Sequence, residues 1–349
     1  MLCCDLHSAL APILAKYDRE QVVVVGDVMA KGEGGVAKGE WPTLWLNVNE
    51  QEKNLTTVTK IWDFFFEKGL TRHGLVIAVG GGALTDMVGF AASTYKRGID
   101  YINVPTTLLA MIDASSGGKT GINYRGLKNS IGLFAQPVAT LIYPGWLRSL
   151  PAKEMLSGFG EMLKTGLIKA TGESLEAKGD LWEALLQYDL ETMLIDGLTP
   201  LIEQCVAVKE AIVASDPKEE GLRKALNFGH TFGHAIEANG EWLEANGRIP
   251  HGYAVVYGMI AELYLSVVKL GCPREPLQQL TQLMLHYYGK PQCKCSDRDR
   301  LIALMQQDKK NEHAAEINCT LLRSIGSPVI NQVITPDEAE EALDYLFSL

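Results

Sequence analysis

The first half of the chain alternates short apolar runs with segments of helical periodicity. Apolar, β-branched runs at 21–25 and 75–79 each end in glycine, as is typical of buried parallel strands. Between them, Val58, Ile61 and Phe65 recur at the spacing of one helix face. This alternation predicts a parallel α/β sheet. We expect strands over 21–25, 41–48, 75–79 and 101–104, and helices over 54–68 and 84–95.

The pattern changes near residue 150. Beyond it, apolar residues recur at helical spacing, and only 316–322 is expected to be extended. A chain of 349 residues is also long enough for two hydrophobic cores. We therefore predict an α/β domain over 1–150 and a mainly α-helical domain over 151–349. The helices of the second domain are expected over 152–171, 178–193, 199–215, 228–239, 252–270, 275–288 and 298–307.

The charge balance narrows the classes of partner. Acidic residues number 42 against 32 basic ones, which gives a net charge of −10. Such a surface disfavours nucleic acid or an anionic membrane as the main partner. A site for an anionic substrate must therefore gather its basic residues locally.

The seven cysteines show no disulfide framework, so we expect a reducing cytoplasm. Cys293 and Cys295 could form a metal clip, but two cysteines without a second pair are a weak signal. The N-terminus has no basic region followed by a long apolar run, so we expect neither a signal peptide nor a membrane span.

Three of the seven histidines lie close together in the sequence. His230 and His234 are four residues apart and would project from one helix face, and His251 would begin the next helix. Three imidazoles converging there could bind zinc with one position left open for water or substrate. The alternative, left open by this stretch alone, is a polar helix with hydrogen-bonded core histidines.

Two glycine-rich segments of the first domain are candidate phosphate sites. Gly80–Gly82 lies between a strand and a helix, where backbone N–H groups can approach an anion, although it does not follow the G-x-G-x-x-G pattern. The segment 104–123 contains Thr106, Thr107 and Lys119, and Lys128-Asn129 follows it. This set predicts a phosphate-bearing substrate beside a nucleotide. A structural turn and a solvated loop are the respective alternatives.

The second domain holds further candidates near the histidines. Glu161 and Lys164 share a helix face, either as a surface pair or as a carboxylate for the histidine site with a lysine facing substrate. Lys209 and Arg223 could bind a second anionic group, such as a carboxylate, which Arg223 suits through its fork of donors. A lone pair of lysines is usually solvated, so Lys309-Lys310 is a candidate only because the other basic residues accompany it.

Taken together, these motifs resemble the 3-dehydroquinate synthase family of sugar phosphate cyclases. The resemblance runs in order from about residue 22 to residue 326. It implies a nucleotide-binding α/β domain followed by a helical metal-binding domain. The stretches that carry it are 80–86, 95–98, 104–123, 128–129, 161–164, 221–237, 251–255 and 308–310.

The resemblance also implies ligands for each residue set. Zn²⁺, with Co²⁺ as the alternative ion, would be held by Glu161, His230 and His251, so that His234 faces the substrate instead. A homodimer is implied, in which Arg97 reaches the substrate phosphate of the neighbouring subunit. NAD would be held by Asp27, Glu50, Lys53, Gly81, Gly82, Asp86, Thr106, Thr107 and Lys128. Catalytic positions would be His234, Lys164, Asp113 and Asn227, and substrate would contact Arg97, Lys119, Asn129, Lys209, Arg223 and Lys310 (or Lys309).

The implied reaction converts 3-deoxy-D-arabino-heptulosonate 7-phosphate to 3-dehydroquinate and phosphate. It proceeds by transient oxidation with NAD, phosphate elimination, re-reduction and aldol closure, and it belongs to the shikimate pathway of aromatic amino acid biosynthesis. Alternatives are a cyclase for an amino-substituted analogue, a metal-dependent polyol dehydrogenase, or a relative that binds without turnover. Three departures from the family are Tyr143, where an aspartate is usual, a slightly longer stretch from His234 to His251, and the poorly matching segment 29–40.

Overall fold

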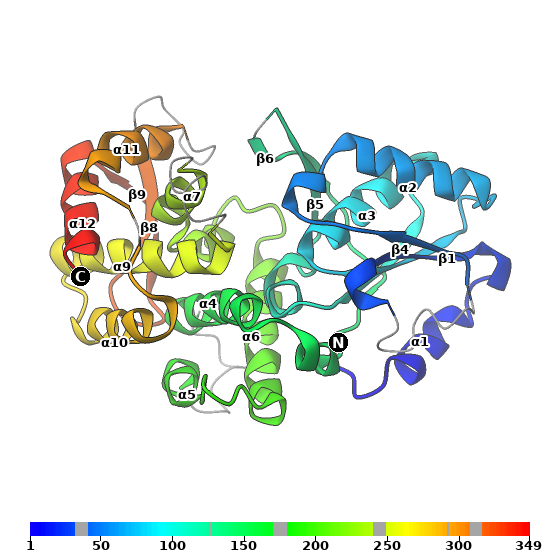
Figure 1. The fold of residues 1–349 in the computed structure, drawn as a ribbon, viewed down its shortest axis with the longest axis horizontal. Coiled ribbons are helices and arrows are strands. Elements are labelled where there is room, and N and C mark those ends of the chain that lie inside the picture. The colour runs from blue at the N-terminus through cyan, green and yellow to red at the C-terminus, as the bar shows by residue number, and fades with distance from the viewer. Residues whose placement is uncertain (32–40, 126, 170–179, 240–248, 292, 308–315) are drawn as a thin grey trace. The chain divides into compact units, whose positions relative to one another are not determined.

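The computed structural model describes residues 1–31, 41–125, 127–169, 180–239, 249–291, 293–307 and 316–349. The chain divides into two compact units, Met1–Pro151 and Ala152–Leu349 (Figure 1). Each unit is described by itself below. The functions that the sequence assigns to each part stay predictions.

Unit 1 is built on a five-stranded parallel sheet with the strand order β2-β1-β3-β4-β7. Val22–Val25 and Leu75–Val79 on the two central strands are buried. Strands buried on both faces read as continuous apolar runs, which is why the sequence located them. The expected parallel α/β fold is confirmed. The strands are β1 (Val22–Asp27), β2 (Thr43–Leu46), β3 (Leu75–Gly80), β4 (Asp100–Pro105) and β7 (Ala139–Thr140).

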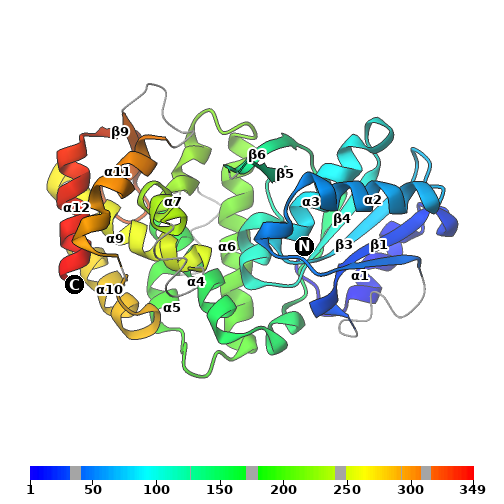
Figure 2. The same cartoon turned by 45° about the horizontal axis from the view of Figure 1, so that its top comes forward.

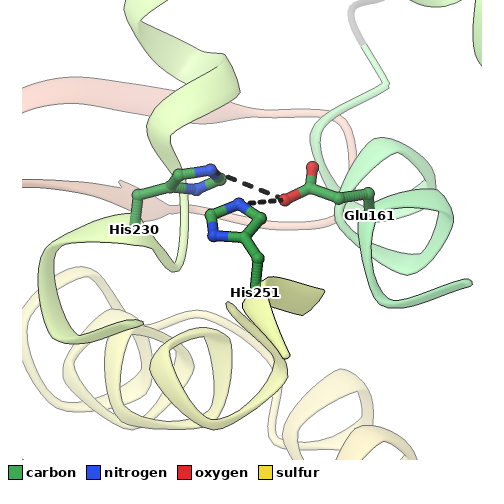
Figure 3. Close-up of side chains that lie close together, drawn as sticks. All are labelled: Glu161, His230 and His251. Carbon is green, nitrogen blue, oxygen red and sulfur yellow. Dashed lines mark ion pairs between the residues drawn. The ribbon is translucent and has the colours of Figure 1, made fainter. Parts of the chain in front are cut away.

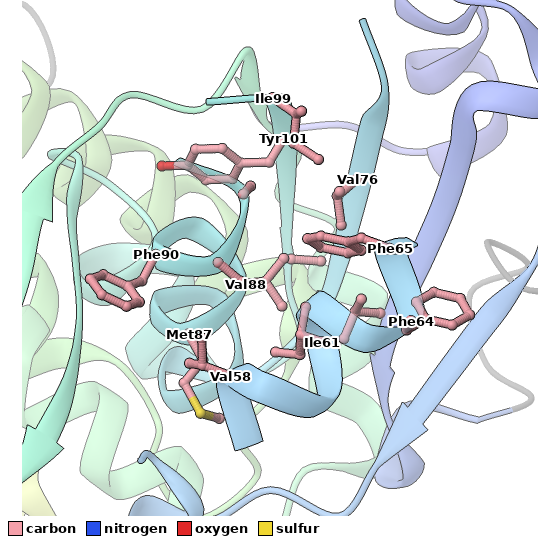
Figure 4. Packing of buried hydrophobic residues seen from close by; sticks show 14 of the residues in the cluster. Val58, Ile61, Phe64, Phe65, Val76, Met87, Val88, Phe90, Ile99 and Tyr101 are labelled. Carbon is pink, nitrogen blue, oxygen red and sulfur yellow. The ribbon is translucent and has the colours of Figure 1, made fainter. Parts of the chain in front are cut away.

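The helices of unit 1 are α1 (Leu6–Leu14), α2 (Leu55–Glu67) and α3 (Gly82–Thr94). Figure 4 shows α2 and α3 contributing Val58, Ile61, Phe65, Met87 and Val88 to one buried cluster against the sheet. Burial of such side chains contributes about 1.5–3 kcal/mol each to folding. This packing fixes the start of α3, and with it the glycine turn.

A two-stranded antiparallel hairpin lies between β4 and β7 in the chain of unit 1. It joins β5 (Lys119–Tyr124) to β6 (Leu127–Phe134) and was not predicted as strands. Most of β6 is exposed, so its sequence lacks the alternation that reveals a half-buried strand. The two strands meet at Gly121 and Gly132, where a Cβ on Gly132 would lie 2.2 Å from the Thr120 carbonyl oxygen.

Unit 2 is mainly helical, as expected, and α9 (His251–Leu270) lies at its centre (Figure 2). This helix contacts α4, α7, α10, α12 and β8. Among the described residues it alone is long and apolar enough to span a membrane, but 67% of its most apolar window is buried, as in the core helix of a globular unit. The other helices are α4 (Ala152–Ile168), α5 (Leu181–Gln187), α6 (Ile195–Ser215), α7 (His230–Ala238), α10 (Glu275–Leu283), α11 (Arg298–Gln306) and α12 (Pro336–Ser348).

Two predictions for unit 2 were wrong in detail, and one helix was not predicted. The helix expected over 178–193 ends at Gln187, and a non-glycine residue with positive φ, Met193, follows it before α6. Residues 316–322 are not the only extended segment, because β8 (Ile317–Leu322) pairs antiparallel with β9 (Pro328–Ile334). Only Ile334 of β9 is fully buried, which weakens its hydrophobic pattern. Helix α12 was also missed.

Helix α12 nevertheless carries a signal at its start, and this gives a stability prediction. The Thr335 Oγ1 accepts the Glu338 N–H at 3.2 Å, and the Glu338 carboxylate accepts the Thr335 N–H at 2.8 Å. This reciprocal cap satisfies two backbone donors. Thr335→Ala should lower the free energy of unfolding by about 1 kcal/mol in urea titrations.

Thr199→Ala is the control for this substitution. It removes a hydroxyl that bonds the Ile195 carbonyl within α6, without touching a cap. Because alanine has the higher helix propensity, the control should leave stability unchanged or slightly raised. Equal losses in the two variants would contradict the role of the cap.

Candidate active site

Three side chains from distant parts of unit 2 converge on one point (Figure 3). Glu161 lies in the middle of α4, while His230 and His251 are the first residues of α7 and α9. The Glu161 Oε1 lies 3.5 Å from the His230 Nε2 and 3.3 Å from the His251 Nε2. Among the described residues, these three form a group whose candidate ligand atoms all lie within 4.8 Å of one another.

Each histidine is oriented through its other ring nitrogen. The His230 Nδ1 lies 3.1 Å from the Phe228 carbonyl oxygen, so it must carry the proton in that hydrogen bond. The His251 Nδ1 lies 3.2 Å from the Glu237 Oε2. Such partners fix the tautomer and ring orientation of metal-binding histidines. Both Nε2 atoms are thereby left to face Glu161.

The spacing of these donors suits a divalent ion. Zinc binds histidine nitrogen and carboxylate oxygen at about 2.0–2.2 Å, so two ligands of a tetrahedral ion lie about 3.4 Å apart. The two distances from the Glu161 Oε1, 3.5 and 3.3 Å, match this value. Two histidines and one carboxylate are a known catalytic zinc set that leaves a position open. The residues therefore fit the ion.

Several ionisable side chains lie close together around the three donors. Burial, the largest influence, lowers the pKa of His251, but hydrogen bonds that its ring donates to Glu161 and Glu237, together with their negative charges, outweigh it and raise the pKa to about 10. The Lys164 Nζ lies 2.5 Å from the Glu161 Oε2, and both side chains are at most 2% exposed. The helix-face pairing of Glu161 with Lys164 is thus present, but it is buried rather than at the surface.

His234 lies next to the converging donors without being one of them. Its ring centroid is 5.1 Å from that of His230 and 5.9 Å from that of His251. The expectation that His230 and His234 share a face of one helix is met, since both lie on α7 one turn apart. His234 is also more exposed than His230. Its predicted role toward substrate stays a prediction.

Glycines let the three helices approach closely enough to bring the donors together. A Cβ on Gly252, directly after His251, would lie 1.8 Å from the Ser157 carbonyl oxygen of α4. A Cβ on Gly258 would lie 1.9 Å from the carbonyl oxygen of Gly229, directly before His230. Close packing of α4 and α7 on α9 therefore depends on residues without side chains.

The basic residues before α7 are held by a tight loop. Arg223 is 1% exposed; its backbone N–H donates to the Asp216 carboxylate at 3.0 Å, and its Nη1 donates to the Pro217 carbonyl at 2.7 Å. Lys209 on α6 is 6% exposed. The Asn227 Nδ2 donates to the Glu219 Oε1 at 2.9 Å. Lys209 and Arg223 are thus both buried cations of unit 2, in addition to Lys164 beside Glu161.

Unit 1 contains a separate polar network around Lys53, which is 3% exposed. The Lys53 Nζ donates to the Asp86 Oδ2 and to the Asn129 Oδ1, both at 2.5 Å. The Asn129 N–H donates to the Asn123 Oδ1, and the Asn123 Nδ2 donates to the Glu50 Oε1 at 2.8 Å. Burial raises the pKa of Asp86, although Lys53 opposes this. One network therefore joins residues predicted to bind NAD (Glu50, Lys53 and Asp86) with a residue predicted to bind the substrate (Asn129).

The glycine turn at the start of α3 has a packing role as well as an open backbone. A Cβ on Gly82 would lie 2.7 Å from the Ala114 Cβ, and a Cβ on Gly81 would lie 3.3 Å from the Thr107 Cγ2. No side chain caps this helix. Its first N–H groups therefore form the kind of helix end that binds phosphate. Ala114 ends a short π-helix, Ala110–Ala114, that also carries Asp113.

The remaining predicted residues are placed as follows. Arg97 is exposed in a strained turn, where Lys96 and Arg97 have φ of 48° and 68°. Asp27 ends β1, and burial raises the pKa of its carboxyl while the Met29 N–H bond lowers it. Thr106 lies just beyond β4, and Lys119 and Lys128 are exposed on the hairpin.

Tyr143, one of the departures from the family, contacts Trp146 edge to face. Lys309, Lys310 and most of the poorly matching segment 29–40 lie outside the described residues.

Sequence reasoning missed three polar residues, of which Glu237 and Glu262 are buried. They are Glu237, which contacts His251; Asn123, which links Glu50 to Asn129; and Glu262, which contacts the start of α7. Glu237 lies three residues after His234, on the histidine face of the helix, and this spacing was a usable signal. Nothing in the sequence near Glu262 indicates its partner, because that partner is a backbone segment about 30 residues away.

Comparison with known proteins gives one family for both units. The sequence matches the family 3-dehydroquinate synthase N-terminal over residues 43–157 and the family 3-dehydroquinate synthase C-terminal over residues 158–311. It is 40% identical to 3-dehydroquinate synthase from Parabacteroides distasonis, over 99% of this chain and 96% of that protein.

Solved structures agree on the fold. A 2-epi-5-epi-valiolone synthase from Streptomyces hygroscopicus, with NAD⁺ and Zn²⁺ bound, superposes with a TM-score of 0.84 at 28% identity, over 100% of this chain and 96% of that one. An iron-containing alcohol dehydrogenase from Thermococcus thioreducens has a TM-score of 0.69 at 13% identity, over 100% and 97% of the chains, which shows a shared fold alone. Full-length identity and matches in both units lead to one conclusion: this chain belongs to the 3-dehydroquinate synthase family.

Proposed function

We propose that this chain converts 3-deoxy-D-arabino-heptulosonate 7-phosphate to 3-dehydroquinate and phosphate, with a divalent metal at Glu161, His230 and His251 and NAD in unit 1. The observation that carries the proposal is the convergence of the three donors, with both histidines oriented through Nδ1. The relative from Parabacteroides distasonis bears the name of this activity.

The metal would supply a Lewis acid that polarises substrate hydroxyls. The chain's own residues prepare the site for it. Glu237 and the Phe228 carbonyl hold the imidazoles with Nε2 directed at Glu161. Lys164 neutralises Glu161, so that the three donors carry less net negative charge. Zn²⁺ fits this donor set, and Co²⁺ accepts the same ligand types.

NAD would supply a hydride acceptor that is regenerated within the reaction. The uncapped start of α3 at Gly81 and Gly82 suits its pyrophosphate. Thr106 and Thr107 follow β4 at the same carboxyl edge of the sheet, where open α/β sheets bind ligands. Asp27, Glu50, Lys53, Asp86 and Lys128 complete the proposed set.

Residues outside the metal and NAD sets would bind and turn over the substrate. Lys119 and Asn129 would hold the phosphate, while Lys209 and Arg223 would hold the carboxylate. His234 would relay a proton beside the metal, as a general acid–base group does. Lys164, Asp113, Asn227 and Lys310 are proposed to complete the set of catalytic and substrate-binding residues.

The buried cations favour this substrate over those of related enzymes. A substrate carboxylate would give the buried cations Lys209 and Arg223 an anionic ligand, which sugar phosphates without a carboxylate do not offer. An amino-substituted analogue would retain the carboxylate and is the second candidate. A polyol dehydrogenase would share the fold but would need neither of these residues.

The test is to incubate the purified protein with the heptulosonate phosphate, NAD and Zn²⁺, and to follow phosphate and NADH together. Phosphate release without net NADH is expected. Steady NADH accumulation would indicate a dehydrogenase, and turnover of only the amino analogue would reassign the substrate. The nucleotide-free protein should release no phosphate.

Arg223→Ala should raise the Michaelis constant for the heptulosonate phosphate by about 30-fold or more, because a buried charge pair is worth about 2 kcal/mol or more. Zinc affinity should change little, since Arg223 is not a metal donor. Lys224→Ala is the control, because Lys224 lies next in sequence and its side chain donates over a long 3.4 Å to Asn331. An unchanged Michaelis constant in Arg223→Ala would contradict the carboxylate assignment.

We further propose a cytoplasmic homodimer. All seven cysteines are free, which supports a reducing compartment. The strained turn at Lys96 and Arg97 presents an exposed arginine, and backbone strain of this kind concentrates at functional sites. Arg97 would reach the substrate phosphate of the second subunit. Light scattering of the purified protein tests the dimer.

A further inference from the structure

Glu262 is a carboxylate with no exposed surface, in the middle of α9. It lies one turn beyond Gly258, on the helix face that Gly229 approaches. A buried carboxylate is costly unless hydrogen bonds satisfy its oxygens. Its partners therefore indicate what it is for.

Those partners are backbone N–H groups on either side of a proposed metal ligand. The Glu262 Oε2 accepts the Gly229 N–H at 2.7 Å, and its Oε1 accepts the Thr231 N–H at 3.2 Å. His230 is the residue between them. Both oxygens of one carboxylate thus hold the backbone segment from which the imidazole of His230 projects.

Helix α7 has no cap of its own. Its N-cap residue is Gly229, with φ of +78° and no side-chain cap hydrogen bond. The first N–H groups of a helix have no partner within the helix and carry partial positive charge. Glu262 supplies from another helix the acceptor and the negative charge that a serine or aspartate usually supplies locally.

We propose that Glu262 is a positioning residue for the metal site, which it serves by fixing the backbone of His230. The inference rests on the proposed metal at Glu161, His230 and His251. His230 is held at two levels: Glu262 fixes its backbone, and the Phe228 carbonyl fixes its ring through Nδ1. Donor atoms that must meet within a few tenths of an ångström need such support.

The two histidine helices support each other reciprocally. Glu237 of α7 contacts the ring of His251, the first residue of α9, while Glu262 of α9 contacts the backbone around His230, the first residue of α7. Each proposed histidine ligand therefore depends on a buried carboxylate from the opposite helix. A shift of α7 against α9 would disturb both ligands together.

Glu262→Gln is the informative substitution, because it keeps size and shape. A carboxamide has only one oxygen, so its NH₂ group must face either the Gly229 or the Thr231 N–H. Substitution of a residue that supports a metal ligand typically lowers metal affinity by about 10- to 100-fold. We expect Co²⁺ affinity, followed by the visible absorption of the bound ion, to fall at least about tenfold, with an altered spectrum.

Ser266→Ala is the matched control on the same helix. The Ser266 Oγ accepts the Leu322 N–H at 2.9 Å and donates to the Glu262 carbonyl, so its loss removes buried hydrogen bonds without touching α7. It should lower the melting temperature but leave Co²⁺ affinity and spectrum unchanged. Glu262→Asp keeps the charge but has a shorter side chain, so its Co²⁺ affinity should lie between those of wild type and Glu262→Gln. It replaces Glu262→Gln in the test if that variant does not fold.

The outcomes separate this inference from the function it rests on. If the wild-type protein binds Co²⁺ and Glu262→Gln or Glu262→Asp binds it equally well, with an unchanged spectrum, the positioning role is overturned. Equal losses of affinity in Ser266→Ala and Glu262→Gln would overturn it too, since general destabilisation would explain both. If wild type itself binds no Co²⁺, the proposed metal site fails first.

Discussion

His230→Ala should lose the metal, whereas His234→Ala should keep it and lose turnover. The two histidines lie one turn apart on α7, but among the described residues His230, and not His234, belongs to the donor group with Glu161 and His251, and its Nε2 lies 3.5 Å from the Glu161 Oε1. Removing one of three protein donors should lower Zn²⁺ affinity by more than about 100-fold, beyond the loss typical of supporting residues. Competition with a coloured chelator measures it.

For His234→Ala we expect zinc affinity within about threefold of wild type. Loss of a proton relay should lower kcat by about 10²–10⁴-fold, with a smaller change in the Michaelis constant. His286→Ala is the control for both, because His286 is exposed and far along the chain, with Glu191 as its contact. Zinc retained by His230→Ala, or lost by His234→Ala, would reverse the assignment of the two residues.

Gly252→Ala should destabilise unit 2 and the metal site together. The added Cβ would lie 1.8 Å from the Ser157 carbonyl oxygen and 2.6 Å from its carbonyl carbon, both backbone atoms of α4. Because backbone cannot rotate away as a side chain can, α4 and α9 must separate. Overpacking usually costs about 1–3 kcal/mol, and we expect about 3 kcal/mol or more in the free energy of unfolding by urea.

The same displacement should weaken zinc binding at least about tenfold, because Gly252 adjoins His251 and Glu161 lies on α4. Gly197→Ala is the matched control within a helix of the same unit. Its Cβ would meet only the Tyr188 ring, at 3.6 Å, and alanine favours α6 by up to about 1 kcal/mol. A Gly252→Ala protein as stable as Gly197→Ala would contradict the close contact of α4 and α9.

The sequence predicted those elements whose burial is uniform or strongly periodic. Strand β3 is buried throughout and β1 is buried up to its last residue, and α2 repeats its apolar face every turn, so local pattern sufficed. Exposed or half-exposed strands such as β6 and β9 were missed, because their residues gain little from burial and show no alternation. The helix predicted over 178–193 runs past the end of α5 because apolar residues continue beyond Gln187.

For the site, the sequence alone determined which kinds of ligand the candidate residues can bind. It showed histidines spaced for one helix face, a carboxylate and lysine at i, i+3, and cations gathered in an acidic chain. Those facts limit the site to metal and anion chemistry, because residue type fixes which ligands a side chain accepts. The resemblance to one family then supplied an ordered set of roles.

Only the tertiary structure decided which of these residues meet. Glu161, His230 and His251 come from three helices, and glycines at 252 and 258 allow those helices to touch. Glu237 and Glu262 became visible as partners only when α7 and α9 were packed together. Local sequence sets which face a side chain occupies, whereas distances between faces depend on the packing of backbones far apart in the chain. That is why the sequence by itself determined the fold class and the candidate ligands, and why the convergence of the donors required the structure.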